Sequence, residues 1–501
     1  MSAKPDLILG IDAGGTTAKA ALFDIQGNLI AVHRRQLPTV TSRGGGRAER
    51  DPDLLWEAVA SALRDLLSSA DNDRAARVAA VCATGFGGGL FAVGSNGKTI
   101  GPAILSSDRR AILDSTSLNK GPLCAAISST LGIELWSAWS LPLFRWIHRS
   151  GDHTYDRADK ILWCKDFIRL RLTGTISTDP TDAATAGLLD LNRETYARDL
   201  ISEACGDVWL DRLPEILPSD AIAGHVTGDA ARQTGLLQGT PVMSGLVDLS
   251  ACALASGVIE PGEISMIAGT WSINQIVATP ETATSRMPIT ALPHLDKSKR
   301  LISFNSARSA GNLSWVLSHM MTVPGQAGQP GDHPAFDRLA DPALLDMDSP
   351  SFFPFLLGGV ETGRGAFLGL GIEHTLPEVV TAMYEGVAFA HTQDSAPIWP
   401  LAREHEAIRL AGGAATSHMW AQLFADCFGR QVETLDCGEL GAKGCAITAA
   451  VSLGAYRNTN IAARTMARVA TRFSANADRH KLLKRRFDRW TRDAEWIASR
   501  S

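Results

Sequence analysis

Residues 7–23 read LILGIDAGGTTAKAALF, and this stretch decides the fold. A short apolar run, residues 7–11, ends at Asp12, and a second run from Lys19 to Phe23 follows a glycine-containing turn. Two such runs around a tight turn are typical of a β-hairpin. The sequence therefore predicts consecutive antiparallel strands at the N-terminus, with Asp12 at the end of the first strand.

The turn after Asp12 has the chemistry of a phosphate-binding loop. Its glycines allow backbone N–H groups to approach phosphate oxygens, and Thr16, Thr17 and Lys19 add donors. An Asp at a strand end can hold Mg²⁺ directly or through its waters. An ordinary Asp-Gly hairpin explains an isolated pattern of this kind about equally well. A Walker A loop is excluded, because Ala92 stands where the stretch ending at Lys98-Thr99 would need its first glycine.

A second hairpin is predicted in the other half of the chain, where Gly269-Thr270 separates runs 263–268 and 271–277. The repeated hairpin favours a duplicated architecture with a boundary near residue 245. We expect one domain over residues 1–245, which contains the phosphate loop, and a second domain over residues 246–460. A C-terminal helical extension is expected over 461–501.

Two further segments combine a strand end with polar or glycine residues. Asp248 follows an apolar strand and precedes a helix of small residues, so it is either a helix N-cap, the commoner role, or a base that accepts a substrate proton. Gly412-Gly413 lies between a strand and the helix that starts near Ser417, which suits a nucleotide. A lone Gly-Gly more often reflects packing.

Composition narrows the class of protein. The net charge of −5 argues against a nucleic-acid partner, and the basic face of the last helix (481–492) is expected to be solvated. The eight cysteines show no C-x-x-C spacing and the histidines no metal signature, so reduced, buried thiols are expected. The first residues lack a signal-peptide layout, and no membrane span is expected. We therefore expect a cytoplasmic protein and leave a homodimer open.

Taken together and in order, these segments resemble the FGGY carbohydrate kinases from about residue 6 to residue 456. Further segments that carry the resemblance are Ile104–Arg110, Lys165–Ile168, Leu172–Gly174, Thr178-Asp179, Tyr384–Phe389, and Gly412–Ala414 with Trp420 and Gln422. The resemblance implies an α/β fold of duplicated ribonuclease-H-like (actin-like ATPase) domains with an interdomain cleft. It also implies ATP and Mg²⁺ as cofactors and a small sugar as substrate, with a sugar-binding domain over residues 1–245 and a nucleotide-binding domain over 246–460.

The resemblance further implies roles for individual residues. Asp12 would serve the metal and phosphates, and Asp248 would be the catalytic base. The residues expected to bind ATP are Asp12, Thr16, Thr17, Lys19, Gly269, Thr270, Gly311, Gly413, Ala414 and Ser417. The residues expected to line the sugar pocket are Phe86, Gly87, Gly88, Asp108, Arg109, Asp166 and Asp248.

Four stretches make L-xylulose the expected substrate within the family. They are Ala48–Asp51, Ser106–Arg110, Gly269–Trp271 and Gly311–Trp315. Phe86–Gly89 stands where D-xylulose kinases typically show Gln-Met-His-Gly, which argues against D-xylulose and predicts a roomier pocket. Asp108 and Arg109 are expected to supply an acceptor and a forked donor to adjacent hydroxyls. Two alternatives stay open: a kinase for ribulose, erythritol or glycerol, and an actin- or chaperone-like nucleotide switch without a sugar substrate.

Overall fold

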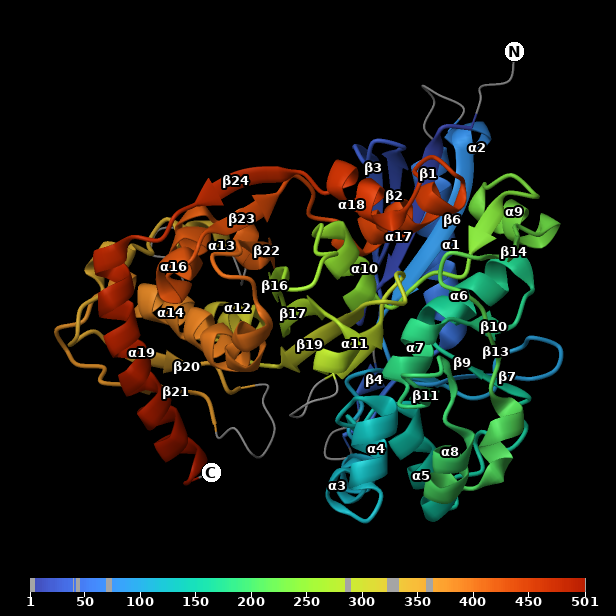
Figure 1. The fold of residues 1–501 in the computed structure, drawn as a ribbon, viewed down its shortest axis with the longest axis horizontal. Helices are drawn as coiled ribbons and strands as arrows, with labels where there is room; N and C mark the ends of the chain where they lie inside the picture. Colours follow the sequence, from blue (N-terminus) through green and yellow to red (C-terminus); the bar gives the residue numbers. More distant parts are fainter. Residues whose placement is uncertain are drawn as a thin grey trace. The chain divides into compact units, whose positions relative to one another are not determined.

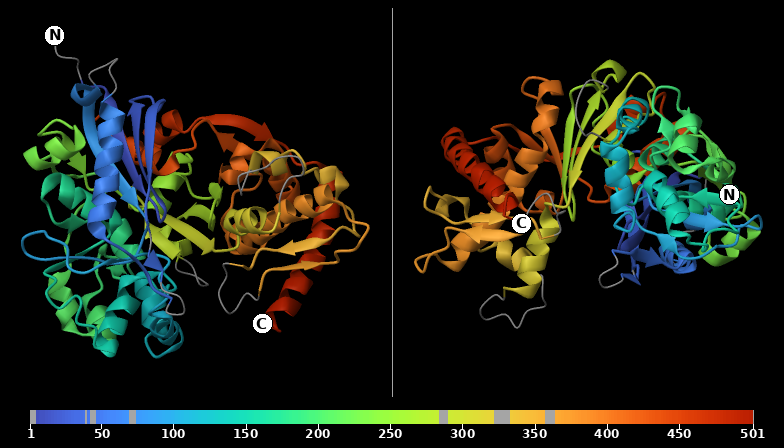
Figure 2. Two further views of the ribbon diagram at one scale, coloured as in Figure 1. Left: turned by 180° about the vertical axis from the view of Figure 1, so that it is seen from behind. Right: turned by 90° about the horizontal axis from the view of Figure 1, so that it is seen from below.

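The computed structural model describes residues 5–38, 40–41, 46–68, 74–283, 290–321, 333–356 and 364–500 (Figures 1 and 2). The chain forms two compact units, each discontinuous in sequence. Unit 1 comprises Met1–Ile259, Thr279–Ile302 and Glu439–Ala467, and unit 2 comprises Glu260–Ala278, Ser303–Gly438 and Arg468–Ser501. This division differs from the expected boundaries at 245 and 460, because the helix after residue 247 and a later helix, 440–452, pack together within unit 1.

The sheet of unit 1 has the strand order β14-β15-β6-β1-β2-β3. Its strands are β1 (Leu7–Ala13), β2 (Thr17–Asp24), β3 (Leu29–Gln36), β6 (Val78–Gly85), β14 (Ile222–His225) and β15 (Pro241–Met243). Strands β1, β2 and β3 are antiparallel neighbours, as predicted, whereas β6 is parallel to both β1 and β15. The carboxyl ends of β1, β6 and β15 therefore lie at one edge of the sheet.

The two faces of β1 pack against different helices because successive side chains alternate across a strand. Leu7, Leu9 and Ile11 share a core with α1 (Pro52–Leu67), α6 (Cys164–Thr173) and α9 (Gly228–Thr234). Gly10 and Asp12 face α17 (Leu440–Ser452) instead. Asp12 is thereby on the face that α17 and α10 (Asp248–Ala255) cover.

Unit 1 contains a second hydrophobic core, built mainly from helices. It is formed by α3 (Ile112–Lys120), α4 (Cys124–Leu131), α5 (Ser140–Ser150) and α8 (Arg198–Cys205) with the strands β7 (Phe91–Val93) and β9 (Lys160–Leu162). Stacked rings of Phe144 and Trp209, 4.1 Å apart, lie in this core. This core supports the segments in which the sequence predicts the sugar pocket.

Unit 2 repeats the strand arrangement around β1. Its sheet contains β17 (Ser272–Ala278), β16 (Ile264–Ala268), β22 (Ile408–Gly412), β23 (Val432–Leu435) and β24 (Val469–Phe473), in that order. Strands β16 and β17 form a hairpin, and β22 runs parallel to β16, as β6 does to β1. The predicted duplicated α/β architecture is confirmed by this correspondence.

The C-terminal segment is not a separate helical extension. Helix α18 (Thr459–Met466) belongs to unit 1, whereas β24 and α19 (Ala477–Ala498) complete unit 2. Helix α19 is not solvated along its whole basic face, since Arg486 is buried and pairs with Glu385 of α14 (Leu376–Asp394) at 2.5 Å. Among the described residues, no helix has both the length and the apolar character that a membrane span requires.

Candidate active site

The carboxyl edge of the unit 1 sheet brings the predicted site segments together. Strands β1 and β6 end in register, with Ala13 opposite Gly85, and the N–H of Phe86 donates to the carbonyl of Ala13 at 3.2 Å. Strand β15 leads to Asp248 at the start of α10. The Asp12 turn, the Phe86–Gly88 segment and the segment before Asp248 therefore all leave the sheet at the same edge, where open α/β sheets bind ligands.

Three glycines allow α17 to approach this edge closely. A methyl group at Gly441 would lie 2.7 Å from the carboxylate of Asp12, and one at Gly10 would lie 2.2 Å from the carbonyl oxygen of Ala442. A methyl group at Gly444 would lie 2.1 Å from the carbonyl oxygen of Ala251. The N-terminal turn of α17 consequently lies directly against Asp12, where the helix dipole favours a negative charge.

Charged neighbours surround Asp12, which remains partly exposed. Burial raises the pKa of Asp12, the Lys19 ammonium lowers it, and the Glu439 carboxylate raises it again. Lys19 Nζ lies 3.1 Å from Glu439, which also pairs with Arg34. Lys19 thus has a partner on the turn that begins α17, in addition to any role toward ATP. Glu439 and Gly441 were missed, because the sequence does not show which helix covers Asp12.

Asp248 is the first residue of α10, and the N-cap position belongs to Val247. Its carboxylate accepts a hydrogen bond from the N–H of Leu249 at 2.7 Å. Burial, and after it the charge of Asp12, raise the pKa of Asp248 to about 7. A carboxyl group with this pKa can accept a proton near neutral pH, which a simple capping residue does not need to do.

The turn after Asp12 leaves space above its backbone. Gly14 donates to the carbonyl of Thr17 at 3.0 Å, and a methyl group at Gly15 would meet no atom within 4 Å. Thr16 is exposed. Arg50, which is buried, donates to the carbonyls of Gly15 and Pro38 and so holds the turn from the protein side.

The predicted sugar-pocket glycines do not leave the extra room that the sequence suggested. A methyl group at Gly87 would lie 2.8 Å from Thr185 Oγ1, and one at Gly88 would lie 2.7 Å from the indole ring of Trp139. Gly88 also has a φ of +72°, which favours glycine. The expectation of a roomier pocket is therefore wrong: the indole of Trp139, missed in the sequence, occupies the space beside Gly88. Phe86 is buried.

Asp108 and Asp166 are fully buried and already have partners. Asp108 accepts hydrogen bonds from the N–H of Ala48 at 2.7 Å and from Arg110 Nε at 2.9 Å and Nη2 at 2.8 Å. Asp166 lies 2.7 Å from Lys165 Nζ and accepts from Thr178 Oγ1 at 2.7 Å. In this structure both carboxylates organise the protein around the predicted pocket, whereas Arg109 is partly exposed.

In unit 2, two predicted nucleotide segments adjoin each other. Strands β16 and β22 end in register, with Ala268 opposite Gly412, so the Gly269-Thr270 turn lies next to Gly413. A methyl group at Gly412 would lie 2.6 Å from the carbonyl oxygen of Ala268, and Gly412 has a φ of +80°.

The predicted nucleotide residues differ in their exposure to solvent. Thr270 is exposed, Gly269 and Gly311 are partly exposed, and Ala414 is buried. Ser417 caps α16 (His418–Phe428) by accepting the N–H of Trp420 at 3.2 Å.

A buried imidazole connects the β16–β17 hairpin to α12 (Ala310–His319), the helix that carries Gly311. His391 Nδ1 lies 2.9 Å from Asn274 Oδ1 and 3.2 Å from Ser272 Oγ, and Nε2 lies 3.0 Å from Ser309 Oγ. Because Asn274 Oδ1 can only accept, Nδ1 carries the proton and Nε2 accepts from Ser309. Burial lowers the pKa of His391 to about 3, so the ring is neutral.

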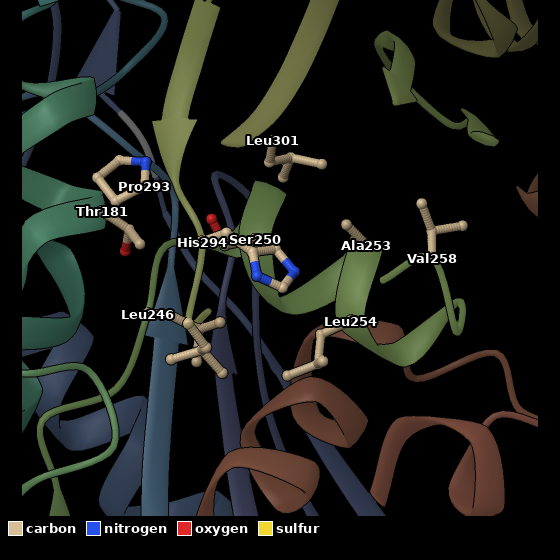
Figure 3. A pocket seen from close by; sticks show the side chains of 10 residues that line it. Thr181, Leu246, Ser250, Ala253, Leu254, Val258, Pro293, His294 and Leu301 are labelled. Atoms are coloured by element: carbon tan, nitrogen blue, oxygen red, sulfur yellow. The ribbon is translucent and has the colours of Figure 1, made fainter. Parts of the chain in front are cut away.

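A small cavity lies beside the first turns of α10, and Figure 3 shows its lining side chains. Thr181, Leu246 and Ser250 border it together with mostly apolar residues: Ala253, Leu254, Val258, Pro293, His294, Leu295 and Leu301. The predicted sugar-pocket residues do not line this cavity. Its apolar lining does not suit a polyhydroxylated ligand.

Family models match both halves of the chain. Residues 7–255 match the N-terminal domain of the FGGY family of carbohydrate kinases, and residues 264–453 match the C-terminal domain. The chain belongs to the FGGY family of carbohydrate kinases. FGGY membership agrees with the paired hairpins and with the carboxylates at the unit 1 sheet edge.

Curated FGGY relatives resemble the chain over most of its length. A probable L-xylulose kinase of Haemophilus influenzae is 30% identical over 452 residues, covering 88% of this chain and 89% of the relative. An L-xylulose/3-keto-L-gulonate kinase of Escherichia coli is 27% identical, covering 96% and 95%. An erythritol kinase of Brucella abortus is 29% identical, covering 91% and 89%.

The fold is also that of solved FGGY structures. A xylulose kinase from Rhodospirillum rubrum superposes with a TM-score of 0.83 at 24% identity, covering 98% of this chain and 100% of that one. A gluconate kinase from Lactobacillus acidophilus gives 0.85 at 21% identity, covering 98% of both chains. At these identities the likeness establishes the fold alone. Family membership makes the protein a carbohydrate kinase and sets aside the alternative of a nucleotide switch without a sugar substrate.

Proposed function

We propose that this FGGY kinase transfers the γ-phosphoryl group of MgATP to a hydroxyl group of a small ketose, with L-xylulose as the preferred substrate. The observation that carries the proposal is the carboxyl group of Asp248, whose pKa is raised to about 7 by burial and by Asp12. In the reaction Asp248 accepts the proton of the substrate hydroxyl as its oxygen attacks the γ-phosphorus. The bond from that phosphorus to the ADP oxygen breaks in line with the attack.

The residues around Asp12 fit a magnesium site of the kind that kinases use. The described residues contain no cluster of three or more His, Cys, Asp or Glu side chains placed to hold a metal. Magnesium in phosphoryl transfer needs only one or two carboxylates, because waters and phosphate oxygens complete its shell. Asp12 is partly exposed, and its pKa is raised chiefly by burial and further by the Glu439 carboxylate, effects on its negative charge that a bound cation would offset. Mg²⁺ there would neutralise charge developing on the transferred phosphoryl group.

Candidate nucleotide-binding segments occur in each unit. In unit 1, the open turn with Thr16 and Thr17 offers backbone N–H groups and hydroxyls to phosphate oxygens. In unit 2, the Gly269-Thr270 turn and Gly413 adjoin each other at one sheet edge. We assign Gly311, Ala414 and Ser417 to the nucleoside side, with contacts made through the backbone where side chains are buried or capping.

L-Xylulose is preferred because the relatives named for it are among the most similar and match nearly the whole chain. Erythritol and xylulose kinases match less strongly but over comparable lengths, so a polyol or another pentulose is the second candidate. The aromatic face of Trp139 beside Gly88 offers an apolar surface against which the sugar carbon chain could pack.

A substrate panel tests the proposal. ADP release is followed at saturating MgATP with L-xylulose, D-xylulose, L-ribulose, D-ribulose, erythritol and glycerol. The highest kcat/KM is expected for L-xylulose, since buried polar groups that lose an expected hydroxyl can cost a factor on the order of 10⁴. A clear preference for erythritol or glycerol would replace the ketose assignment and leave the kinase assignment standing.

A further inference from the structure

We infer that Thr181, through the N–H of Val247, positions the catalytic carboxylate of Asp248, and that a buried charge cluster behind Thr181 fixes it in place. This inference rests on the proposed role of Asp248 as the base. Thr181 does not reach the substrate by this account, so it is a positioning residue and not a catalytic one.

The connection between β15 and α10, residues 244–247, determines where Asp248 lies. It is not part of a strand or helix, so its backbone groups need partners from elsewhere. Within the connection, the N–H of Ser244 donates to the carbonyl of Ala221 at 2.8 Å, and the N–H of Gly245 donates to the carbonyl of Ser219 at 2.9 Å. A methyl group at Gly245 would lie 2.2 Å from the carbonyl oxygen of Ala83, so the connection runs tightly against β6.

Three buried side chains complete the anchoring of this connection. Arg169 Nη1 donates to the carbonyl of Ser244 at 2.6 Å, and Thr84 Oγ1 donates to the carbonyl of Leu246 at 2.7 Å. The N–H of Val247, the residue directly before Asp248, donates to Thr181 Oγ1 at 2.8 Å. The Thr181 contact is thus the side-chain contact nearest in sequence to the proposed base. Figure 3 shows Thr181 and Leu246 among the side chains that line the cavity next to α10.

Thr181 is itself held by an ionised carboxylate. Its hydroxyl donates to Asp179 Oδ2 at 2.7 Å, and its N–H donates to the same oxygen at 3.0 Å. Asp179 Oδ2 also accepts from Ser219 Oγ at 2.6 Å, and Asp179 Oδ1 lies 2.9 Å from Lys165 Nζ. Because the hydroxyl hydrogen is committed to Asp179, the lone pairs of Thr181 Oγ1 face the N–H of Val247.

The cluster around Asp179 contains three buried carboxylates and two cations. Lys165 Nζ lies 2.7 Å from Asp166, 2.9 Å from Asp179 and 2.9 Å from Asp182, and Arg169 lies 3.0 Å from Asp166. Burial and the carboxylates of Asp166 and Asp179 raise the pKa of Asp182 well above its ordinary value. Burial also acts to raise the pKa of Asp179, but Lys165 and hydrogen bonds from Ser219 and Thr181 outweigh it and lower that pKa. Asp179 therefore keeps the negative charge that orients Thr181.

This arrangement accounts for polar residues that the phosphoryl transfer does not otherwise use. A buried ion cluster is a costly way to gain stability, because desolvation offsets most of the attraction between the charges. Its rigidity, in contrast, is useful directly behind a group whose misplacement by about 1 Å can lower a rate by 10²-fold. The cluster, Thr181 and Thr84 together hold the residues 244–247 before Asp248 in one conformation.

The test compares Thr181→Val, Thr181→Ser and a matched control, Thr234→Val. Thr234 is also buried, donates to the carbonyl of Ala230 at 2.7 Å and accepts the N–H of Leu236 at 3.2 Å, but it lies at the end of α9. Thr181→Val should lower kcat about 10- to 100-fold with KM for sugar and MgATP within about twofold. Thr181→Ser should restore most of kcat, and Thr234→Val should keep it while losing a similar amount of thermal stability.

Each other outcome has a defined meaning when Asp248→Asn is assayed in parallel. Three results would overturn the positioning role while Asp248→Asn stays inactive. They are full kcat in Thr181→Val, no recovery of kcat in Thr181→Ser, and an equal loss of kcat in Thr234→Val. An active Asp248→Asn enzyme would overturn the proposed base and the inference with it. If Thr181→Val does not fold, the Thr181→Ser enzyme decides: its kcat must stay near the wild-type value.

Discussion

In unit 1 the connection that ends at Asp248 is anchored by charged side chains, whereas in unit 2 the connection into α12 is anchored by a neutral imidazole and hydroxyl groups. The first depends on Lys165, Arg169 and Asp179, and the second on His391 and Ser309. Both connections follow a strand and lead into a helix assigned to the site. The two connections are not topological equivalents, since β15 corresponds to β23 of unit 2, yet each fixes the start of a helix assigned to the site. The difference in charge between the two networks predicts that they respond differently to substitution.

The largest difference should appear when the central cation of the unit 1 cluster is removed. Lys165→Met leaves buried carboxylates without their shared partner, and breaking a buried ion pair typically costs about 3–5 kcal/mol. The free energy of unfolding, measured by urea denaturation, should fall by about this amount, with little folded enzyme at 37 °C. A loss below about 1 kcal/mol would show that the cluster is not an ion network of the kind described.

The unit 2 network should be weaker and more selective in its effect. His391→Ala removes the bridge between Ser309 and Asn274, and leaving buried hydrogen-bonding groups unsatisfied costs about 1–3 kcal/mol. KM for MgATP should rise about tenfold while KM for the sugar stays within twofold. The matched control is His480→Ala. His480 lies on α19, and its Nδ1 contacts the carbonyl oxygen of Asp426 on α16, away from the β16–β17 hairpin. Equal changes in both KM values would contradict a role specific to the nucleotide side.

The smallest expected difference concerns the pH dependence of the rate, which should reflect Asp248 in unit 1 and not His391 in unit 2. Asp248 has a folded pKa of about 7, so protonation below that pH removes the base, and kcat/KM for the sugar should fall about tenfold per pH unit. His391, with a pKa of about 3, should not titrate in the same range. Initial rates at saturating MgATP between pH 5.5 and 9 measure this, and a flat profile down to pH 5.5 would contradict the assignment to Asp248.

The sequence allowed the fold to be predicted where local signals were strong. The hairpin around residues 13–17, the repeated hairpin at Gly269-Thr270 and the strand–turn–helix at Gly412 are each encoded within a few residues. The domain boundaries were harder, because α17 returns to unit 1 only through long-range packing. Gly10, Gly441 and Gly444 are visible as glycines in the sequence, but nothing local shows that each one faces a neighbouring element closely.

The site was predictable to a similar degree and for the same reason. Asp12 and Asp248 stand at strand ends, and a strand end is readable from an apolar run. Asp108 and Asp166 are also polar residues after apolar runs, yet the structure buries both among hydrogen-bonding partners. Burial depends on segments distant in sequence, such as Ala48 for Asp108, and a single sequence does not reveal those partners. Thr181 and His391 were missed for the same reason, because their hydrogen-bonding partners are distant in sequence.

The central claim is tested most directly by the turnover of Asp248→Asn at saturating MgATP and L-xylulose, measured at pH 8. We expect kcat to fall about 10²–10⁴-fold while MgADP binding is retained. The variant should also be more stable than the wild type at this pH. The carboxyl group of Asp248 has a raised pKa in the folded state, so its ionisation destabilises the fold as pH rises through about 4 to 7, and Asn does not ionise. A folded variant with near-normal kcat would show that Asp248 is not the catalytic base.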